Sequence, residues 1–205
     1  MGPAKLSSDP FNLIITGVGG QGNVLASRLL GNLLAGQGYL VTIGETFGAT
    51  QRGGSVMSHI RVSSESTWSP LIPKGKAHMV VALEPTEALR VLMDYGNPGT
   101  QAIANTRPIY SVGVICGEQS YPSDEDIAKW MSEMTARHWF VSATQEALAM
   151  GSPIFGNIIL IGALAATGVL PLPRDGFERV LAATVSADKV KTNLAAYDKG
   201  YGMIA

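Results

Sequence analysis

Apolar positions along the chain follow two spacings, and the order of these spacings predicts the first elements of the fold. Residues 12–16 form a short apolar run typical of a buried strand, and residues 23–35 carry leucines, among them Leu29 and Leu33, at helical spacing. Residues 39–43 form a second apolar run. A strand, a helix and a strand in this order predict a parallel pair of strands joined by a right-handed crossover.

The pattern changes after this first unit. Residues 44–54 are rich in glycine and too few to hold a crossover helix, whereas residues 55–62 carry β-forming side chains at even spacing. Parallel neighbours need a connection of a dozen or more residues, so the third strand is expected to run antiparallel to the second or to form an edge. A nucleotide-binding Rossmann half would have a helix at this point.

The remaining pattern predicts short strands alternating with helices, followed by a helical C-terminal region. Strands are expected at residues 77–83, 101–104, 109–112 and 140–141, and helices at 84–93 and at 123–135, where Ser123 is the predicted cap. From Thr144 onward we expect three or four helices, with breaks at 151–153, 171–173 and Gly200. The predicted fold is a three-layer Rossmann-like α/β domain with a mostly parallel sheet, one antiparallel or edge strand and a helical C-terminal region.

The chain is expected to consist of a flexible N-terminal tail, residues 1–10, and one domain, residues 11–205. Its 205 residues, 46% hydrophobic and 15% charged, are enough for a large core. The run 158–161 with Leu164 is apolar around much of a helix, which predicts burial on more than one side. Two interpretations stay open: this helix covers the domain's own sheet, or it belongs to a broad surface that binds a partner.

Charge and cysteine content argue against several classes of function. With 15 basic and 16 acidic residues, the chain has no field that would attract nucleic acid or a membrane surface. Residues 1–10 lack the apolar core of a signal peptide, so a cytoplasmic location is expected. A single cysteine, Cys116, cannot build an iron–sulfur cluster within this chain. The three histidines lack metal-ligand spacing: His59, His78 and His138.

A glycine-rich turn, residues 17–22, directly follows the first predicted strand. Its Gly-x-Gly-x-x-Gly pattern places backbone N–H groups at the start of a helix, where they can face an anion. Glu45 lies 23 residues after Gly22, near the position of the acid that holds the ribose of a dinucleotide. NAD or FAD binding is therefore one interpretation, and close packing of a helix on a sheet is the other.

A second glycine-rich loop, residues 48–55, carries an arginine and a glutamine. The guanidinium group of Arg52 suits a carboxylate or a phosphate, and the glycines after it allow close approach of a ligand or of another chain. Gln51 can donate and accept hydrogen bonds at once. The structural alternative is a tight loop in which Arg52 pairs with a local acid such as Glu45.

The sequence shows no nucleophile–base pair and no paired carboxylates at useful positions. Glu84, at the end of an apolar strand, is expected to be a helix N-terminal acid rather than a catalyst. This lack of catalytic equipment predicts a chain that shapes or closes a site whose chemistry is supplied by another subunit.

Taken together, the two glycine-rich loops resemble the gamma-type module of the 2-oxoacid:ferredoxin oxidoreductases, and within that family the small subunit that accompanies an indolepyruvate-oxidising partner. The similarity rests on residues 17–22 and 45–56 and continues through 82–89, Asn105, Tyr121-Pro122 and Gly156-Asn157. It covers most of the chain beyond residue 11. The predicted cofactor-binding residues are Gly17, Gly19, Gly20, Gln21, Gly22, Gln51, Arg52, Gly53 and Gly54.

The resemblance implies a reaction in which an arylpyruvate is decarboxylated on thiamine diphosphate, electrons pass through 4Fe–4S clusters to ferredoxin, and the acyl group leaves on coenzyme A. It also implies that thiamine diphosphate, Mg²⁺ and the clusters belong to a larger alpha subunit in a hetero-oligomer. Phe47 stands where this family would have a histidine, so the aryl 2-oxoacid stays open. Two other functions also stay open, an independent NAD-dependent dehydrogenase and a scaffold that binds no ligand.

Overall fold

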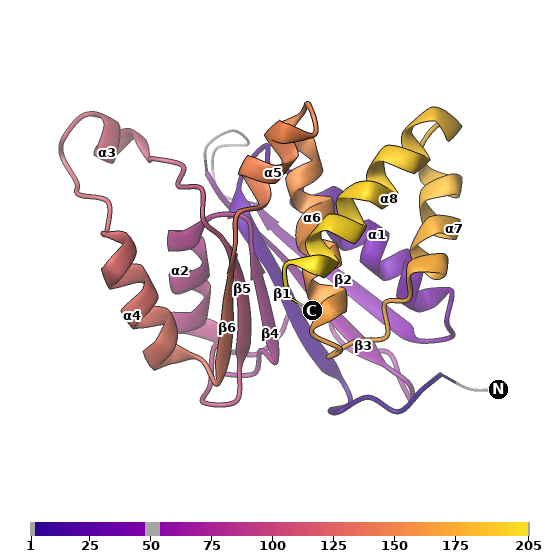
Figure 1. Ribbon diagram of the computed structural model, residues 1–205. Coiled ribbons are helices and arrows are strands. Elements are labelled where there is room, and N and C mark those ends of the chain that lie inside the picture. The colour runs from indigo at the N-terminus through magenta and orange to yellow at the C-terminus, as the bar shows by residue number, and fades with distance from the viewer. Residues whose placement is uncertain (1–2, 48–53, 205) are drawn as a thin grey trace.

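The computed structural model describes residues 3–47 and 54–204, which form a twisted sheet covered by helices on both faces (Figure 1). Within these residues the sheet has six strands in the order β2-β3-β1-β4-β5-β6. The strands are β1 (Phe11–Val18), β2 (Leu40–Phe47), β3 (Ser55–Ser63), β4 (Met79–Ala82), β5 (Gln101–Asn105) and β6 (Arg137–Val141). The mostly parallel α/β sheet predicted from the sequence is therefore confirmed.

Strand β3 is the antiparallel strand that the glycine-rich connection predicts. It pairs antiparallel with β1 on one side and with β2 on the other, so that β2 forms the edge of the sheet. The expected direct pairing of β1 with β2 is wrong, because β3 inserts between them. The cause is the short connection 48–54, which lets the chain turn back beside β2 but not cross over the sheet.

Helices cover the two faces of the sheet unequally. On one face lie α2 (Pro85–Tyr95) and α4 (Asp124–Met134), and on the other lie α1 (Asn23–Ala35) and α6 (Gly156–Ala166). Outside α6 packs α8 (Ala187–Gly202), and α7 (Arg174–Thr184) packs against α8 and α1, so that these two helices add a further layer (Figure 1). Short elements connect these layers: α3 (Val112–Ile115), α5 (Ala143–Ala149) and the 3₁₀ turn η1 (Pro153–Phe155).

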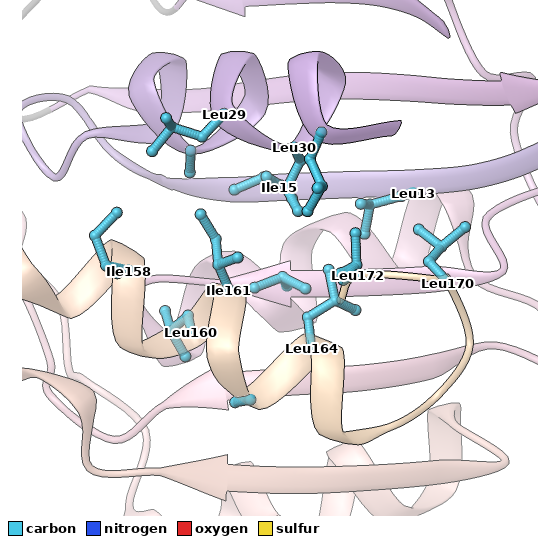
Figure 2. Packing of buried hydrophobic residues seen from close by; sticks show 14 of the residues in the cluster. Leu13, Ile15, Leu29, Leu30, Ile158, Leu160, Ile161, Leu164, Leu170 and Leu172 are labelled. Carbon is cyan, nitrogen blue, oxygen red and sulfur yellow. The ribbon is translucent and has the colours of Figure 1, made fainter. Parts of the chain in front are cut away.

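Helix α6 is buried on all sides within this chain. Ile159 and Leu164 have no exposed surface, and Figure 2 shows α6 side chains gathered against Leu13 and Ile15 of β1 and against Leu29 of α1. The same helix packs on its outer side against α8. The interpretation that α6 covers the domain's own sheet is therefore correct, and its apolar run is not available to a partner.

Two glycines let α6 and α8 cross with their backbones in contact. A Cβ atom on Gly162 of α6 would collide with the carbonyl oxygen of Tyr197, and one on Gly200 of α8 would collide with that of Ile159. The predicted break at Gly200 is wrong, because α8 continues to Gly202. Glycine weakens a helix by roughly 1 kcal/mol relative to alanine, but here the close crossing requires it.

Between β5 and α4 the chain leaves the sheet, and residues 107–121, here called the arm, carry α3 away from the body (Figure 1). The predicted strand at 109–112 is wrong: α3 begins there instead, capped by Ser111, whose Oγ accepts a hydrogen bond from Val114 N. The cap predicted at Ser123 is confirmed at the start of α4. Across the ranges described, no helix combines the length and the apolar character that crossing a membrane would require.

Candidate functional site

A crevice of about 490 Å³ lies at the edge of the sheet where the parallel strands end. Three of its lining residues lie at or beyond the ends of strands. Gly22 is in the loop after β1, Leu83 directly follows β4, and Asn105 is the last residue of β5. Arg107 from the arm and Asn157 from α6 complete it. Open α/β sheets bind their ligands at this edge, so the crevice is the candidate site.

A larger hollow of about 600 Å³ lies elsewhere, against α8. Its cation, Arg174, donates to both carboxylate oxygens of Asp198, at 2.6 and 2.8 Å. Because this charge is already paired and no lining residue follows a strand of the sheet, we do not assign this hollow a ligand.

The first glycine-rich loop forms one wall of the crevice. Gly20 and Gly22 have φ angles of 103° and 88°, a region that residues with side chains rarely adopt. A Cβ atom on Gly22 would also collide with Nδ2 of Asn157. The loop therefore needs both glycines for its turn, and it needs Gly22 also for its packing against α6.

Gln21 is engaged inside this loop. Val18 N donates to its Oε1 at 2.7 Å, and its Nε2 donates to the carbonyl of Leu83 at 2.9 Å. The amide thereby ties the end of β1 to the end of β4. Its side chain shapes the wall of the crevice, while contact between Gln21 and a ligand stays a prediction.

The first turn of α1 begins at the crevice without a side-chain cap. Gly22 is the N-cap residue, and no acidic side chain stands in the first turn. The N–H groups of an uncapped first turn, together with the helix dipole, form a site for an anion. Arg107, an exposed side chain that lines the same crevice, adds a positive charge.

Asn157 is a buried polar side chain of the crevice with one atom left unpaired. The residue is 2% exposed, and its Nδ2 donates to the carbonyl of Gly22 at 3.3 Å. Its Oδ1 is buried and accepts no hydrogen bond from any described residue. Leaving such an acceptor unsatisfied costs about 1–3 kcal/mol. A ligand N–H or O–H group that reached this atom would recover that cost.

The described end of the second glycine-rich loop meets the first loop. Gly19 N donates to the carbonyl of Gly54 at 2.8 Å, and Val18 pairs with Ser55 in the β1–β3 ladder. The expected proximity of the two loops is therefore met at Gly54. Three predicted ligand-binding residues, Gln51, Arg52 and Gly53, lie outside the described residues, and their roles stay predictions.

Glu87 anchors the start of β3 from the opposite face of the sheet. It is only 8% exposed, accepts from Ser55 Oγ at 2.6 Å and is paired with Arg90 Nη2 at 2.6 Å. Thr16 of β1 donates to the same carboxylate at 3.3 Å. This network was not predicted from the sequence, because an acid in the first turn of a helix is ordinarily only a partner of the helix dipole.

Glu84 is the N-cap of α2, as expected, and is not one of the residues lining the crevice. Its carboxylate is fully buried and accepts from Glu87 N at 2.9 Å and from Thr86 Oγ1 at 2.7 Å. It also accepts from the hydroxyl of Tyr121 at 2.5 Å. Burial first, and then this hydrogen bond, raise the pKa of Tyr121 well above its usual value.

With this geometry in place, comparison with known proteins decides the family. The model of the family described as "Pyruvate ferredoxin/flavodoxin oxidoreductase" matches residues 12–203. The chain belongs to this family. The match includes both glycine-rich loops, the crevice and the arm, so the resemblance predicted from the two loops is confirmed.

Curated relatives within the family agree with this assignment. "Indolepyruvate oxidoreductase subunit IorB" from Pyrococcus horikoshii is 37% identical over 93% of this chain and 94% of its own length. The protein of the same name from Thermococcus kodakarensis is 36% identical over the same shares.

Solved structures share the fold of this chain, although only about a fifth of their residues are identical to it. Pyruvate oxidoreductase subunit PORC from Thermotoga maritima superposes with a TM-score of 0.72 at 20% identity, covering 96% of this chain and 97% of that one. The 2-oxoglutarate:ferredoxin oxidoreductase from Magnetococcus marinus, with 2-oxoglutarate, coenzyme A and succinyl-CoA bound, gives 0.74 at 21% identity. There the match covers 97% of this chain but 31% of the other, so the same fold is one part of a longer chain.

The strand order argues against the independent dehydrogenase. A dinucleotide site needs the acid of the second strand beside the glycine loop, but here β3 separates β2 from β1. Glu45 of β2 instead lies near α1, where Ser27 Oγ donates to it at 3.4 Å. The acid that suggested ribose binding thus sits one strand too far from the loop.

The cysteine content of this chain does not fit an iron–sulfur cluster. Among the residues described, no group of three or more His, Cys, Asp or Glu side chains is placed to hold a metal ion. One cysteine cannot supply the four thiolates that a 4Fe–4S cluster takes, and Cys116 lies exposed on the arm. We therefore derive no electron-transfer step through a cluster on this chain.

Sequence reasoning missed the polar side chains that follow the later strands. Asn105 Nδ2 donates to the carbonyl of Leu83 at 3.0 Å and to Thr144 Oγ1 at 2.8 Å, which joins the ends of β4, β5 and β6 beneath the crevice. Asn105 and Asn157 were indicated only by the family resemblance, and Arg107 was not predicted as a site residue. A polar residue directly after a buried apolar strand was the signal that could have identified Asn105.

Proposed function

We propose that this chain is the small, cluster-free subunit of a thiamine-diphosphate-dependent 2-oxoacid:ferredoxin oxidoreductase, with indolepyruvate as the aryl 2-oxoacid. The complex would oxidatively decarboxylate the 2-oxoacid to an acyl-CoA in the cytoplasm and pass electrons to ferredoxin. Support comes from the family match and from relatives named as indolepyruvate oxidoreductase subunits at 37% and 36% identity.

The role of this chain in that reaction is to shape and close the active site of a larger alpha subunit. The crevice carries this proposal, because it combines the uncapped N-terminus of α1, the guanidinium of Arg107 and the unpaired Oδ1 of Asn157. The first two suit a phosphate or a carboxylate, and the third suits an amide or hydroxyl donor. Coenzyme A carries all of these groups except a carboxylate, and the 2-oxoacid carries the carboxylate.

When bound in the partner subunit, thiamine diphosphate supplies the carbanion chemistry of decarboxylation, and the clusters supply the electron path. The residues of this chain bind and orient the anionic co-substrate and exclude water at the mouth of the crevice.

The direct test is co-expression of this chain with its larger subunit. We expect a stable complex that reduces ferredoxin only when indolepyruvate and coenzyme A are both present. If this chain binds the larger subunit, but the larger subunit alone turns over as fast as the complex, the scaffold would be favoured. Activity of the isolated chain with NAD and a 2-hydroxy acid would favour the dehydrogenase.

The ligand role is tested by Arg107→Ala and Arg52→Ala in that complex. A charge-assisted hydrogen bond contributes about 1.5–3 kcal/mol when well formed, so kcat/KM for coenzyme A or for the 2-oxoacid should fall at least roughly tenfold while the complex still assembles. Arg28→Ala is the matched control, because Arg28 is also exposed and lies on α1 but does not line the crevice. Loss of assembly with full activity of the residual complex would mean that these arginines are structural or interface residues.

A further inference from the structure

The arm exposes apolar side chains to a degree that ordinary surface residues do not. Val112 and Ile115 on α3 are 76% and 72% exposed, and Tyr110 beside them is 52% exposed. Residues 108–117 contain no Lys, Arg, Asp or Glu. Figure 1 shows this segment projecting from the body of the molecule. A single exposed apolar residue needs no explanation, but several on one projecting, uncharged segment indicate an interaction site.

The base of the arm is held in place by one buried carboxylate. Glu84 Oε1 accepts from Ile109 N at 3.4 Å near the start of the arm and from the Tyr121 hydroxyl at 2.5 Å at its end. The rings of Tyr110 and Tyr121 pack edge to face with centroids 5.1 Å apart. The arm is therefore preorganised, which lowers the entropy lost when it docks.

The position of the arm determines where a protein that binds it must lie. Ile109 and Arg107, at its base, line the crevice. A body that covers α3 would therefore stand at the mouth of the crevice, on the side where the parallel strands end. Helix α6 is buried within this chain and cannot make such a contact, whereas the exposed side chains of α3 can.

We propose that the arm docks into an uncharged apolar groove of the larger alpha subunit and thereby places that subunit over the crevice. This inference rests on the proposed function for the identity of the partner. The absence of charge in residues 108–117 matches an apolar protein groove and offers nothing to nucleic acid or to anionic lipid headgroups. In the Magnetococcus marinus structure the same fold makes up 31% of a longer chain, so there it is covalently attached to further protein.

The test uses the double variant Val112→Asp/Ile115→Asp in the co-expressed complex. Both side chains are exposed, so the chain should fold with an unchanged melting temperature. Desolvating two carboxylates in an apolar groove is unfavourable, so the dissociation constant of the complex should rise at least roughly tenfold. Met93→Asp is the control, because Met93 is also 76% exposed but lies on α2, and it should leave the affinity unchanged.

Three results would overturn the inference. The first is a double variant that binds the larger subunit as tightly as wild type. The second is a wild-type chain that dimerises through the arm, seen as a loss of dimer mass in the double variant without loss of the complex. The third is binding of the wild-type chain, but not of the double variant, to phosphatidylcholine vesicles. If wild type itself does not bind the larger subunit, the proposed function fails first, so the two failures are distinguishable.

Discussion

Helix α6 and the arm are both apolar, yet they meet opposite environments. In α6 every residue from Gly156 to Leu164 is buried, whereas on the arm Val112 and Ile115 are more than two thirds exposed. The difference comes from what surrounds each segment. Helix α6 lies between the sheet and α8, while α3 sits at the tip of an excursion that returns to the body only at Tyr121.

This contrast shows that an apolar composition predicts that a segment will be buried, but does not predict which surface will cover it. For α6 the covering surface belongs to the same chain, so the residues contribute to its stability. On the arm, Val112 and Ile115 of α3 are left uncovered, so they contribute little to stability and are available for association. Substitutions in the two regions should therefore separate folding from assembly.

The largest expected effect is on the α6 side of the comparison. Leu164→Ala removes a fully buried side chain from the main core and should lower the free energy of unfolding by about 2–5 kcal/mol. Val112→Ala on the arm should change it by less than about 0.5 kcal/mol. Urea unfolding of the isolated chain measures both. Equal losses would mean that the arm packs on the body in solution.

A smaller effect is expected where α6 crosses α8. Gly200→Ala puts a methyl group against the carbonyl of Ile159 and should cost about 1–3 kcal/mol. Gly202→Ala is the matched control in the same helix, because no atom lies within 4 Å of its added Cβ. The control should be neutral or stabilising by up to about 1 kcal/mol, since alanine favours helix. A neutral Gly200→Ala would show that the two helices are farther apart in solution.

The smallest effect is a pH dependence that the core has and the tip of the arm lacks. Burial lowers the pKa of His59 from its ordinary 6.5, so the folded state keeps this ring neutral where the unfolded chain takes up a proton. Stability from this group is complete above about pH 6.5 and is lost as the pH falls from there toward the lowered pKa.

His59→Asn should flatten this part of the pH profile, because it removes the titrating ring. The amide oxygen of the new side chain can still accept from Ile72 N, as Nδ1 of His59 does. Thermal unfolding of both proteins between pH 7.5 and roughly 5 measures the slopes. Burial also lowers the pKa of His78, so some slope of the same sign should persist in the variant. An unchanged slope would mean that His59 is exposed to solvent in the folded protein.

Local spacing was sufficient for much of the fold. Helix α1 is found at the predicted residues 23–35, and the caps of α2 and α4 at Glu84 and Ser123 are as expected. The strand at 109–112 was mispredicted because β-forming side chains on a projecting segment look the same as those of a buried strand. Gly200 was mispredicted because a glycine that ends a helix and one that allows a close helix crossing have the same sequence signature.

For this protein the sequence by itself determined most of the elements, the antiparallel course of β3 and the family, because periodicity, connection length and paired glycine loops are local properties of the chain. Only the tertiary structure decided which elements are neighbours. It placed β3 between β1 and β2, buried α6 beneath α8, brought Asn157 against Gly22 and left α3 uncovered. The physical reason is that burial and hydrogen-bond satisfaction depend on residues distant in sequence, as Asn157 and Gly22 are. The spacing of residues along the chain does not show which of these distant residues come into contact.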